Sequence, residues 1–130
     1  MALPDAWKDI LNQPVLIHFT TLNEDGSPST SPVWVAVDGD DLIVNSAVGR
    51  LKDRNVRRDA RVALSAVDPE NPYKALMVQG RVTEITTEGA EAQIDALAKK
   101  YIGQDKYPWR RPGEVRVNYR IRPEKVATMG

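Results

Sequence analysis

A cluster of cationic side chains in one short segment points to anion binding. Six of them lie within twelve residues, opposed only by Asp53 and Asp59: Arg50, Lys52, Arg54, Arg57, Arg58 and Arg61. The cluster follows an apolar, strand-like run over residues 42–45 and a flexible Gly49. Backbone N–H groups at a helix start lack partners, and the helix dipole favours negative charge there. A strand that opens through small residues into a basic helix therefore predicts a site for a phosphorylated molecule.

The spacing within the cluster predicts a helix from about residue 49 to residue 59. Residues three or four apart are neighbours on a helix, so four arginines are expected on one face: Arg50, Arg54, Arg57 and Arg61. Leu51 and Val56 are then the expected buried contacts. A charge run on a short helix is also compatible with a plain solvated face, and this alternative stays open.

Composition limits the classes of protein to consider. The length of 130 residues fits a single domain, 1–130, and 18 basic residues balance 18 acidic ones, which argues against nucleic-acid binding. The absence of cysteine and the single histidine exclude disulfides, thiol catalysis and the usual zinc sites, so we expect no metal. With no membrane-length apolar run and no signal-peptide pattern, we expect a cytoplasmic protein that does not contact a membrane.

The pattern along the chain predicts many short strands and a few helices. Helices are expected at 4–13, at the basic cluster, and from Thr86 or Thr87 as the cap to about residue 101, with Gly103 ending the last one. Strands are expected at 15–21, 30–37, 41–46, 61–67, 74–85 and 114–121, with a short last segment at 124–127. Asp-Gly at 25–26 marks a hairpin, and the first three strands are expected to form a meander. Strands joined mainly by hairpins favour a mostly antiparallel barrel.

Several single residues need separate interpretation. Gly80, in the middle of a long strand, predicts a bulge or a close approach of another backbone. His18 lies between apolar strand residues and has no evident partner, so a structural or exposed histidine is favoured over a catalytic one. Trp109, in an arginine-flanked loop, either gates a substrate pocket or packs at a dimer edge. Asp25 and Asp38 are expected to form turns rather than to act as acids.

The order of four segments resembles a known superfamily. The segments are TTLNEDGSP at 20–28, SPVWV at 31–35, DGD at 38–40, and the run from Asn45 to Leu64. The chain resembles the split β-barrel flavin and deazaflavin oxidoreductases, of which pyridoxamine 5′-phosphate oxidase is the best-known type. It resembles most the branch that uses the deazaflavin coenzyme F420. The resemblance implies a mostly β (α+β) fold, a six- to seven-stranded antiparallel split β-barrel with peripheral helices.

The same resemblance implies a homodimer with cofactor bound at the subunit interface. Arg50 and Lys52 match positions that contact the cofactor phosphate, and the ring matches the strand of Pro32, Val33 and Trp34, although Trp34 is equally suited to packing the barrel. The remaining positions implied to bind cofactor are Asn45, Ser46, Ala47, Asn55 and Gln79. Further cations are candidates for the acidic tail of F420: Arg54, Arg57, Arg58, Arg110 and Arg111.

We therefore expect an oxidoreductase that uses reduced F420 to transfer a hydride to a small electron-poor organic substrate. The cofactor carries such chemistry, so no catalytic side chain is named, and the proton is expected from solvent. One alternative is an FMN-dependent oxidase or reductase, although the extra substrate-phosphate residues of pyridoxamine phosphate oxidases find no clear match. A second alternative is a non-catalytic F420 carrier. A small RNA-binding barrel is disfavoured by the neutral charge and the lack of an aromatic stacking platform.

Overall fold

A computed structural model describes residues 2–130 as one curled sheet with three helices. The helices are α1 (Asp5–Leu11), α2 (Leu51–Arg58) and α3 (Ala90–Ile102). The strands are β1 (Ile17–Leu22), β2 (Pro28–Val33), β3 (Val35–Asp38), β4 (Asp41–Ala47), β5 (Arg61–Asp68), β6 (Asn71–Thr86) and β7 (Arg116–Met129). In the described residues no helix is both long and apolar enough to cross a membrane.

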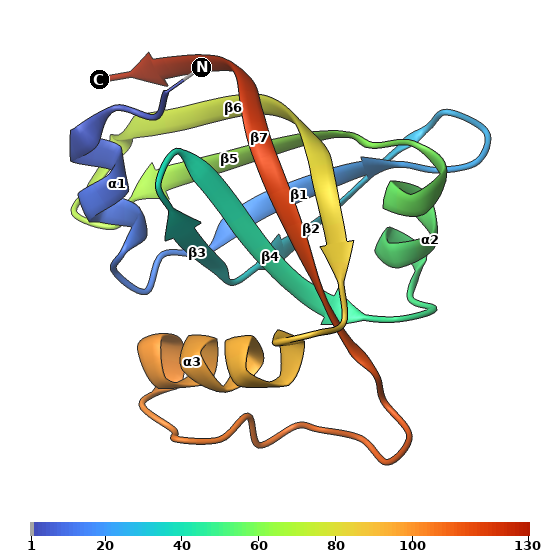
Figure 1. Cartoon of the computed structure of the whole chain (residues 1–130). Coiled ribbons are helices and arrows are strands. Elements are labelled where there is room, and N and C mark those ends of the chain that lie inside the picture. Colours follow the sequence, from blue (N-terminus) through green and yellow to red (C-terminus); the bar gives the residue numbers. More distant parts are fainter. Residues whose placement is uncertain (1) are drawn as a thin grey trace.

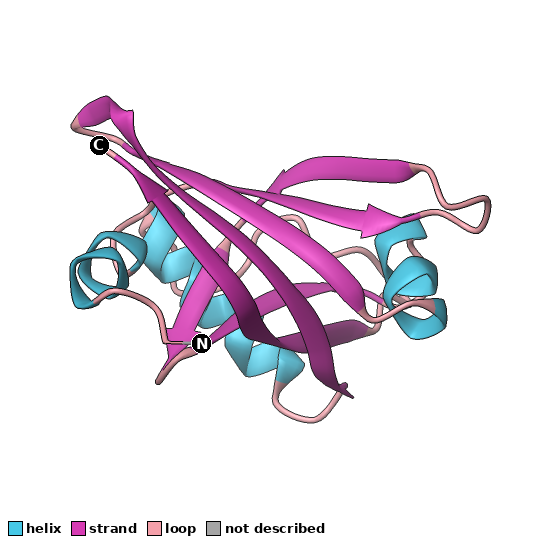
Figure 2. Ribbon diagram, turned by 90° about the horizontal axis from the view of Figure 1, so that it is seen from above, coloured by secondary structure: helices cyan, strands magenta, loops and turns pink. Residues whose placement is uncertain are grey.

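All seven strands pair antiparallel in the order β2-β1-β5-β6-β7-β4-β3. The sheet curls strongly, with α1 and α2 at opposite ends and α3 running below β4 and β7 (Figure 1). Seen from above, the long strands twist across one another over the helices (Figure 2). The prediction of a mostly β, antiparallel split barrel with peripheral helices is confirmed, with seven strands.

The expected meander of the first three strands is wrong. The predicted strand 30–37 is two strands, β2 and β3, which only Trp34 separates, and they lie at opposite edges of the sheet. Because the sheet curls, the chain passes from one edge to the other at Trp34, and this crossing is the seam of the barrel. Two side chains of α3 hold the seam: Tyr101 Oη accepts from Val35 N at 3.1 Å, and Lys100 Nζ donates to Val35 O at 2.7 Å.

The core fills the inside of the curl. Along β1 the inward residues Ile17 and Phe19 are buried, whereas His18 between them is exposed, as its strand position requires. The largest side chains that are almost fully buried include Tyr119, Phe19, Leu11, Leu42 and Ile121, so α1, β1, β4 and β7 share one core. This arrangement places the outer faces of β4 and β7 against α3.

Some predicted boundaries need correction. The last two predicted segments form one strand, β7, and Thr86 belongs to β6 rather than capping α3. Gly89, with φ of 77°, is the N-cap of α3, and no side chain caps it. Gly103 ends α3 as predicted. The prediction for Gly80 is also confirmed, because a Cβ there would lie 2.7 Å from Arg122 O, where the β6–β7 register shifts.

Candidate functional site

A cavity of about 230 Å³ lies where α3, the loop before β7, the start of α2 and the barrel seam meet. It gathers six of the ten residues predicted to bind cofactor: Pro32, Val33, Trp34, Asn45, Arg50 and Lys52. The rest of its lining consists of Leu16, Ile94, Leu97, Tyr107, Trp109 and Arg116. The cavity has a basic end, formed by Arg50, Lys52 and Arg116, and an aromatic end, formed by Trp34, Tyr107 and Trp109. The two ends meet where the Arg116 guanidinium lies 5.1 Å from the centroid of the Tyr107 ring.

The turn that presents Arg50 and Lys52 is held by a buried carboxylate. Asp53, only 1% exposed, accepts from Gly49 N at 2.9 Å and from Tyr119 Oη at 2.8 Å. Gly49 adopts φ of 93°, which a residue with a side chain rarely tolerates. Burial opposes ionisation of Asp53, but its bonds from Gly49, Tyr119 and Arg57 hold its pKa below the ordinary value. Burial and the Asp53 charge raise the pKa of Tyr119, so its hydroxyl stays a donor.

The helix after this turn differs from the prediction on two points. Leu51, expected to be buried, is 48% exposed, whereas Val56 is buried as expected. The polar residues Asp53 and Asn55 take the other inward positions, because each finds hydrogen-bond partners there. Arg61 does not share the helix face, since it begins β5 and pairs with Asp59 at 2.7 Å.

Three cations border the cavity, and their surroundings differ. Lys52 is half-buried and has no ion pair or side-chain hydrogen bond within residues 2–130. Desolvation and the nearby charges of Arg50 and Arg116 lower its pKa. Arg50 pairs with Glu114 at 2.9 Å and keeps 46% of its side chain exposed. Arg116 is 3% exposed, and its guanidinium donates to Glu114 at 2.6 Å and to Asn45 at 2.9 Å. Glu114 thus pairs with two of the three cations, Arg50 and Arg116, whereas Lys52 has no such partner in the described residues. This end of the cavity therefore carries an excess of positive charge that could bind an anion.

The aromatic end is built around Trp34. Its ring stacks on Tyr101 with centroids 5.2 Å apart, and Tyr107 and Trp109 approach it at 6.0 and 6.2 Å. The loop that carries Tyr107 and Trp109 is tied to α3, where Asp95 accepts from Tyr107 N at 2.9 Å and from Arg110 at 3.0 Å. Trp109 is nevertheless 59% exposed and forms the outer wall of the cavity. Its two predicted roles, gating a substrate pocket and packing at a dimer edge, stay predictions.

Four predicted cofactor residues lie outside this cavity. Ser46 and Ala47 are buried at the end of β4. Asn55 is also buried, and its amide donates to Thr21 Oγ1 at 3.0 Å and to Asn23 Oδ1 at 2.9 Å, so it holds α2 to the β1–β2 hairpin. Gln79 is exposed on the outer face of the sheet, in a different hollow that His18 also lines. Cofactor contacts from these four residues stay predictions.

The arginines predicted to receive an acidic tail also separate into two groups. Arg57 is bonded to Asp53, Arg58 donates to Leu22 O at 2.7 Å, and Arg110 pairs with Glu91 at 2.7 Å. Arg54, in contrast, makes no ion pair or side-chain hydrogen bond in the described part of the chain. Of the three candidate tail arginines on α2, Arg54 thus has the least competition for a new partner.

Sequence reasoning did not select Arg116, Glu114 or Tyr107 as site residues. Glu114 lies 64 positions from Arg50, and no local pattern links the two. The available signal was indirect: Arg116 begins a strand in which apolar residues otherwise alternate with polar ones, and a buried cation at such a position needs a partner.

The two aspartates that were expected to form turns can also be placed. Asp25 accepts from Ser27 N at 2.9 Å, as predicted, and Asp38 ends β3 and pairs with Arg120 at 2.6 Å.

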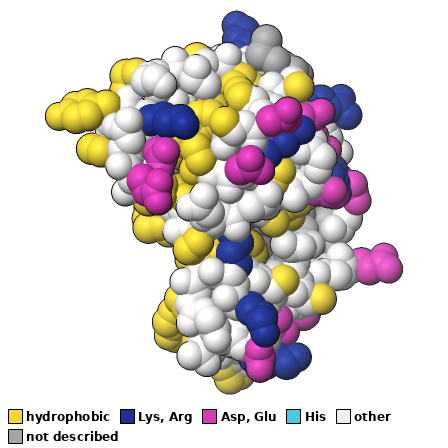
Figure 3. All heavy atoms as spheres, turned by 90° about the vertical axis from the view of Figure 1, so that its left-hand side faces the viewer, with side chains coloured by type: hydrophobic (Ala, Val, Ile, Leu, Met, Phe, Trp, Pro, Cys, Tyr) yellow, Lys and Arg dark blue, Asp and Glu magenta, His cyan; other side chains and the backbone are white. Residues whose placement is uncertain are grey.

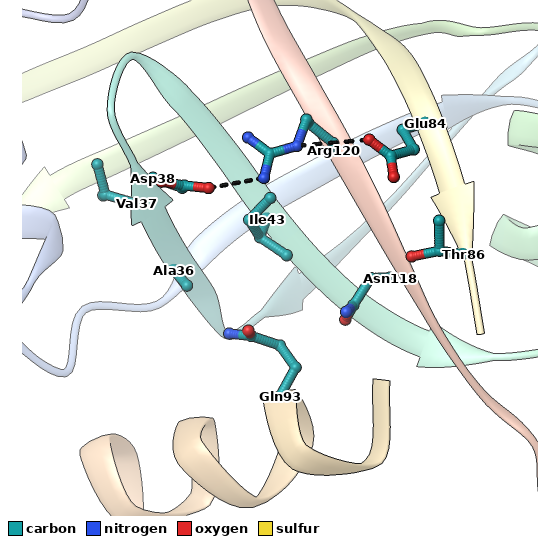
Figure 4. A pocket seen from close by; sticks show the side chains of 9 residues that line it. All are labelled: Ala36, Val37, Asp38, Ile43, Glu84, Thr86, Gln93, Asn118 and Arg120. Carbon is teal, nitrogen blue, oxygen red and sulfur yellow. Dashed lines mark hydrogen bonds and ion pairs between the residues drawn. The ribbon is translucent and has the colours of Figure 1, made fainter. Parts of the chain in front are cut away.

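A second hollow, of about 380 Å³, is lined by residues of β3, β4, β6, β7 and α3, among them Asn118 (Figure 4). Its single cation, Arg120, points between Asp38 and Glu84, and Asp41 accepts from it as well. Its charges are therefore already paired. On the face seen from the left of Figure 1, cationic and anionic side chains are likewise interspersed among apolar ones (Figure 3). The excess of positive charge around Lys52 distinguishes the first cavity from these surfaces.

Comparisons with known proteins agree with this arrangement. A solved structure described as an F420 reductase superposes with a TM-score of 0.83 at 31% identity, over 96% of this chain and 98% of that one. A putative pyridoxamine 5′-phosphate oxidase from Listeria innocua gives 0.72 at 21% identity, over 95% of both chains. The heme storage protein HutZ from Vibrio cholerae gives 0.70 at 15% identity, over 100% of this chain and 96% of that one. The last two show the fold alone.

No curated protein sequence matches the chain. A family model does: the model described as pyridoxamine 5′-phosphate oxidase matches residues 3–130. The match spans all seven strands and the whole cavity described above. The chain therefore belongs to the pyridoxamine 5′-phosphate oxidase family, whose split-barrel fold binds flavin or F420.

Proposed function

We propose that this protein is an F420-dependent reductase acting on a small electron-poor organic molecule. The observation that carries the proposal is one cavity that combines Lys52 with an aromatic wall. Lys52 lies near Arg50 and Arg116 and has no ion pair or side-chain hydrogen bond within residues 2–130. A phosphate-bearing ring cofactor requires cationic groups for its phosphate and an aromatic surface for its ring. The 31% identity to an F420 reductase over 96% of the chain supports the choice of deazaflavin.

The residues present fit such a cofactor. Lys52 offers a point charge, and the arginines offer planar forks that bind phosphate oxygens in pairs. Desolvation strengthens these contacts, because a half-buried Lys52 has given up part of its water shell on folding. Trp34 presents an aromatic surface for a planar ring, held in place by its stacking on Tyr101. When bound, reduced deazaflavin supplies a hydride, and the chain's task is to hold the ring and admit the substrate beside it.

Arg54 supports F420 over FMN. FMN ends at its phosphate, whereas F420 continues into a carboxylate-bearing tail. Arg54 follows Lys52 on α2 and has no partner within the described residues, so it is available to such a tail. An exposed contact of this kind contributes about 0.2–1 kcal/mol and weakens with salt. The tail therefore gives F420 an advantage that the phosphate alone does not.

We also propose that the protein is a homodimer that packs through the outer face of β5, β6 and β7. Val67, Met77 and Met129 on these strands are 44%, 39% and 53% exposed, and the strand register places all three on the same face of the sheet. A shallow hollow of about 480 Å³ on this face includes Gln79 and His18. A second copy seated here would cover Gln79, a predicted cofactor residue that lies outside the cavity. Sedimentation at micromolar concentration tests this, and a monomer would refute it.

Titration of the purified protein with F420 and with FMN, followed by fluorescence, tests the cofactor. We expect F420 to bind more tightly at low salt. Equal or tighter FMN binding would favour the flavin-dependent alternative. Turnover with reduced F420 and a panel of electron-poor acceptors then separates a reductase from a cofactor carrier, since a carrier binds F420 but oxidises none of it. Failure to bind either molecule would refute the proposal.

A further inference from the structure

Glu114 is the carboxylate that organises the basic end of the cavity without lining it. It lies two residues before β7, and its side chain is 6% exposed. One oxygen, Oε1, accepts from Arg50 Nη2 at 2.9 Å and from Arg116 Nη1 at 2.6 Å. The other, Oε2, accepts from Arg111 N at 3.1 Å. All three donors therefore converge on one buried side chain.

Two opposite roles are possible for a carboxylate in this position. As a nearby negative charge, it would repel a bound phosphate and weaken binding. As a fixed anchor, it would hold two arginines in the geometry that a phosphate needs, so their side-chain entropy is lost on folding rather than on binding. The structure favours the second role, because Arg50 is 46% exposed and Glu114 provides its only side-chain hydrogen bond in the described residues.

The ionisation of Glu114 is consistent with an anchor. Burial opposes its charge, but the bond from Arg111 N and the two guanidinium groups outweigh burial and lower its pKa. Glu114 therefore stays charged at neutral pH, and Arg50 and Arg116 stay paired. Through Arg111 it also ties the loop that carries Trp109 to the basic end of the cavity.

We propose that Glu114 is a positioning residue for phosphate binding: it preorganises Arg50 and Arg116. The inference rests on the proposed function, since it needs a phosphate in this cavity. It predicts that removing a negative charge beside an anion site weakens anion binding, which is the reverse of what charge alone predicts. It also predicts that shortening the side chain weakens binding although the charge is unchanged.

Glu114→Asp and Glu114→Gln test these two statements, with FMN and riboflavin as probes. Both variants are expected to bind FMN three- to tenfold more weakly than the wild type. Riboflavin, which lacks the phosphate, is expected to bind all three proteins equally, whereas a general loss of structure would weaken both ligands. Glu91→Gln is the matched control, because Glu91 also pairs with an arginine, Arg110, but lies outside the cavity lining.

A double variant with Arg50→Gln measures the coupling. If Glu114 acts through Arg50, the combined loss in Glu114→Gln/Arg50→Gln will be smaller than the product of the single losses. Tighter FMN binding by Glu114→Gln, or unchanged binding by Glu114→Asp, would overturn the inference while leaving the cofactor assignment intact. A wild-type protein that binds neither FMN nor F420 would instead refute the proposed function, and the inference with it. If Glu114→Gln does not fold, Glu114→Asp decides the outcome alone.

Discussion

Replacing Lys52 by methionine should separate binding from stability. Lys52 is half-buried, has no partner in the described residues, and lies near Arg50 and Arg116. The charge of Lys52 therefore destabilises the folded protein when no ligand is bound, and it becomes favourable only when an anion binds. We expect Lys52→Met to leave the free energy of unfolding unchanged or to raise it by up to about 0.5 kcal/mol. The same change should weaken cofactor binding.

The size of the binding loss follows from one charge-assisted contact. Such a bond contributes about 1.5–3 kcal/mol, and about 1.4 kcal/mol changes an equilibrium constant tenfold. The dissociation constant of FMN should therefore rise by a factor of roughly ten to one hundred. Fluorescence titration measures the binding, and urea denaturation measures the stability on the same samples.

Arg54→Gln serves as the matched control, two residues further along the same helix. Since Arg54 is assigned to a tail that FMN lacks, its replacement should leave FMN affinity unchanged. Two results would refute the reasoning. FMN affinity that survives Lys52→Met would mean that the phosphate lies elsewhere. A drop in stability of more than about 1 kcal/mol would mean that Lys52 has a structural partner.

Three further predictions concern salt, acid and base. Arg54→Gln should weaken F420 binding severalfold at low salt and much less at high salt; an effect that is independent of salt would contradict an exposed ionic contact. Asp53→Asn should lower stability by about 1.5–3 kcal/mol at neutral pH. Because the folded pKa of Asp53 is lowered, its contribution is present above pH 3.8 and is lost as pH falls further, so wild type and variant should converge in acid denaturation curves. Burial lowers the pKa of Lys100 from an ordinary 10.5 to about 8. Between pH 8 and 10.5 the lysine is protonated in the unfolded chain but not in the folded one, so the free energy of unfolding should rise with pH over this range. Lys100→Met should flatten that rise in urea denaturation at pH 7.5 and 10.

Local signals in the sequence predicted local structure well. The Asp25-Gly26 hairpin, the end of α3 at Gly103 and the close approach at Gly80 are each dictated by neighbouring residues or by the absence of a side chain. The prediction that Leu51 is buried was wrong for a related reason. An apolar residue is expected inside, but Asp53 and Asn55 find hydrogen-bond partners there and take the inward positions.

The pairing of strands that are distant in the sequence could not be predicted from local residue patterns. Nothing local indicates that the strand containing Trp34 crosses from one edge of the sheet to the other, because hairpin signals report only adjacent strands. The same limit applies to the site. Arg50 and Lys52 were found from their own segment and from the family resemblance, whereas Glu114 and Arg116 come from the far end of the chain. Only the folded sheet brings the two segments together.

The strand order also determines when the chain can fold during synthesis. The hairpins β1–β2 and β3–β4 need only nearby residues, but β4 is joined to the rest of the sheet through β7, and β7 lies between β6 and β4. Until residues 116–121 of β7 have left the ribosome, the β3–β4 hairpin has no neighbouring strand beside β4, and its apolar face stays exposed. A nascent or truncated chain that lacks β7 therefore keeps an unpaired strand edge and exposed apolar surface, which are features that favour aggregation, and the pairing of β7 closes the sheet.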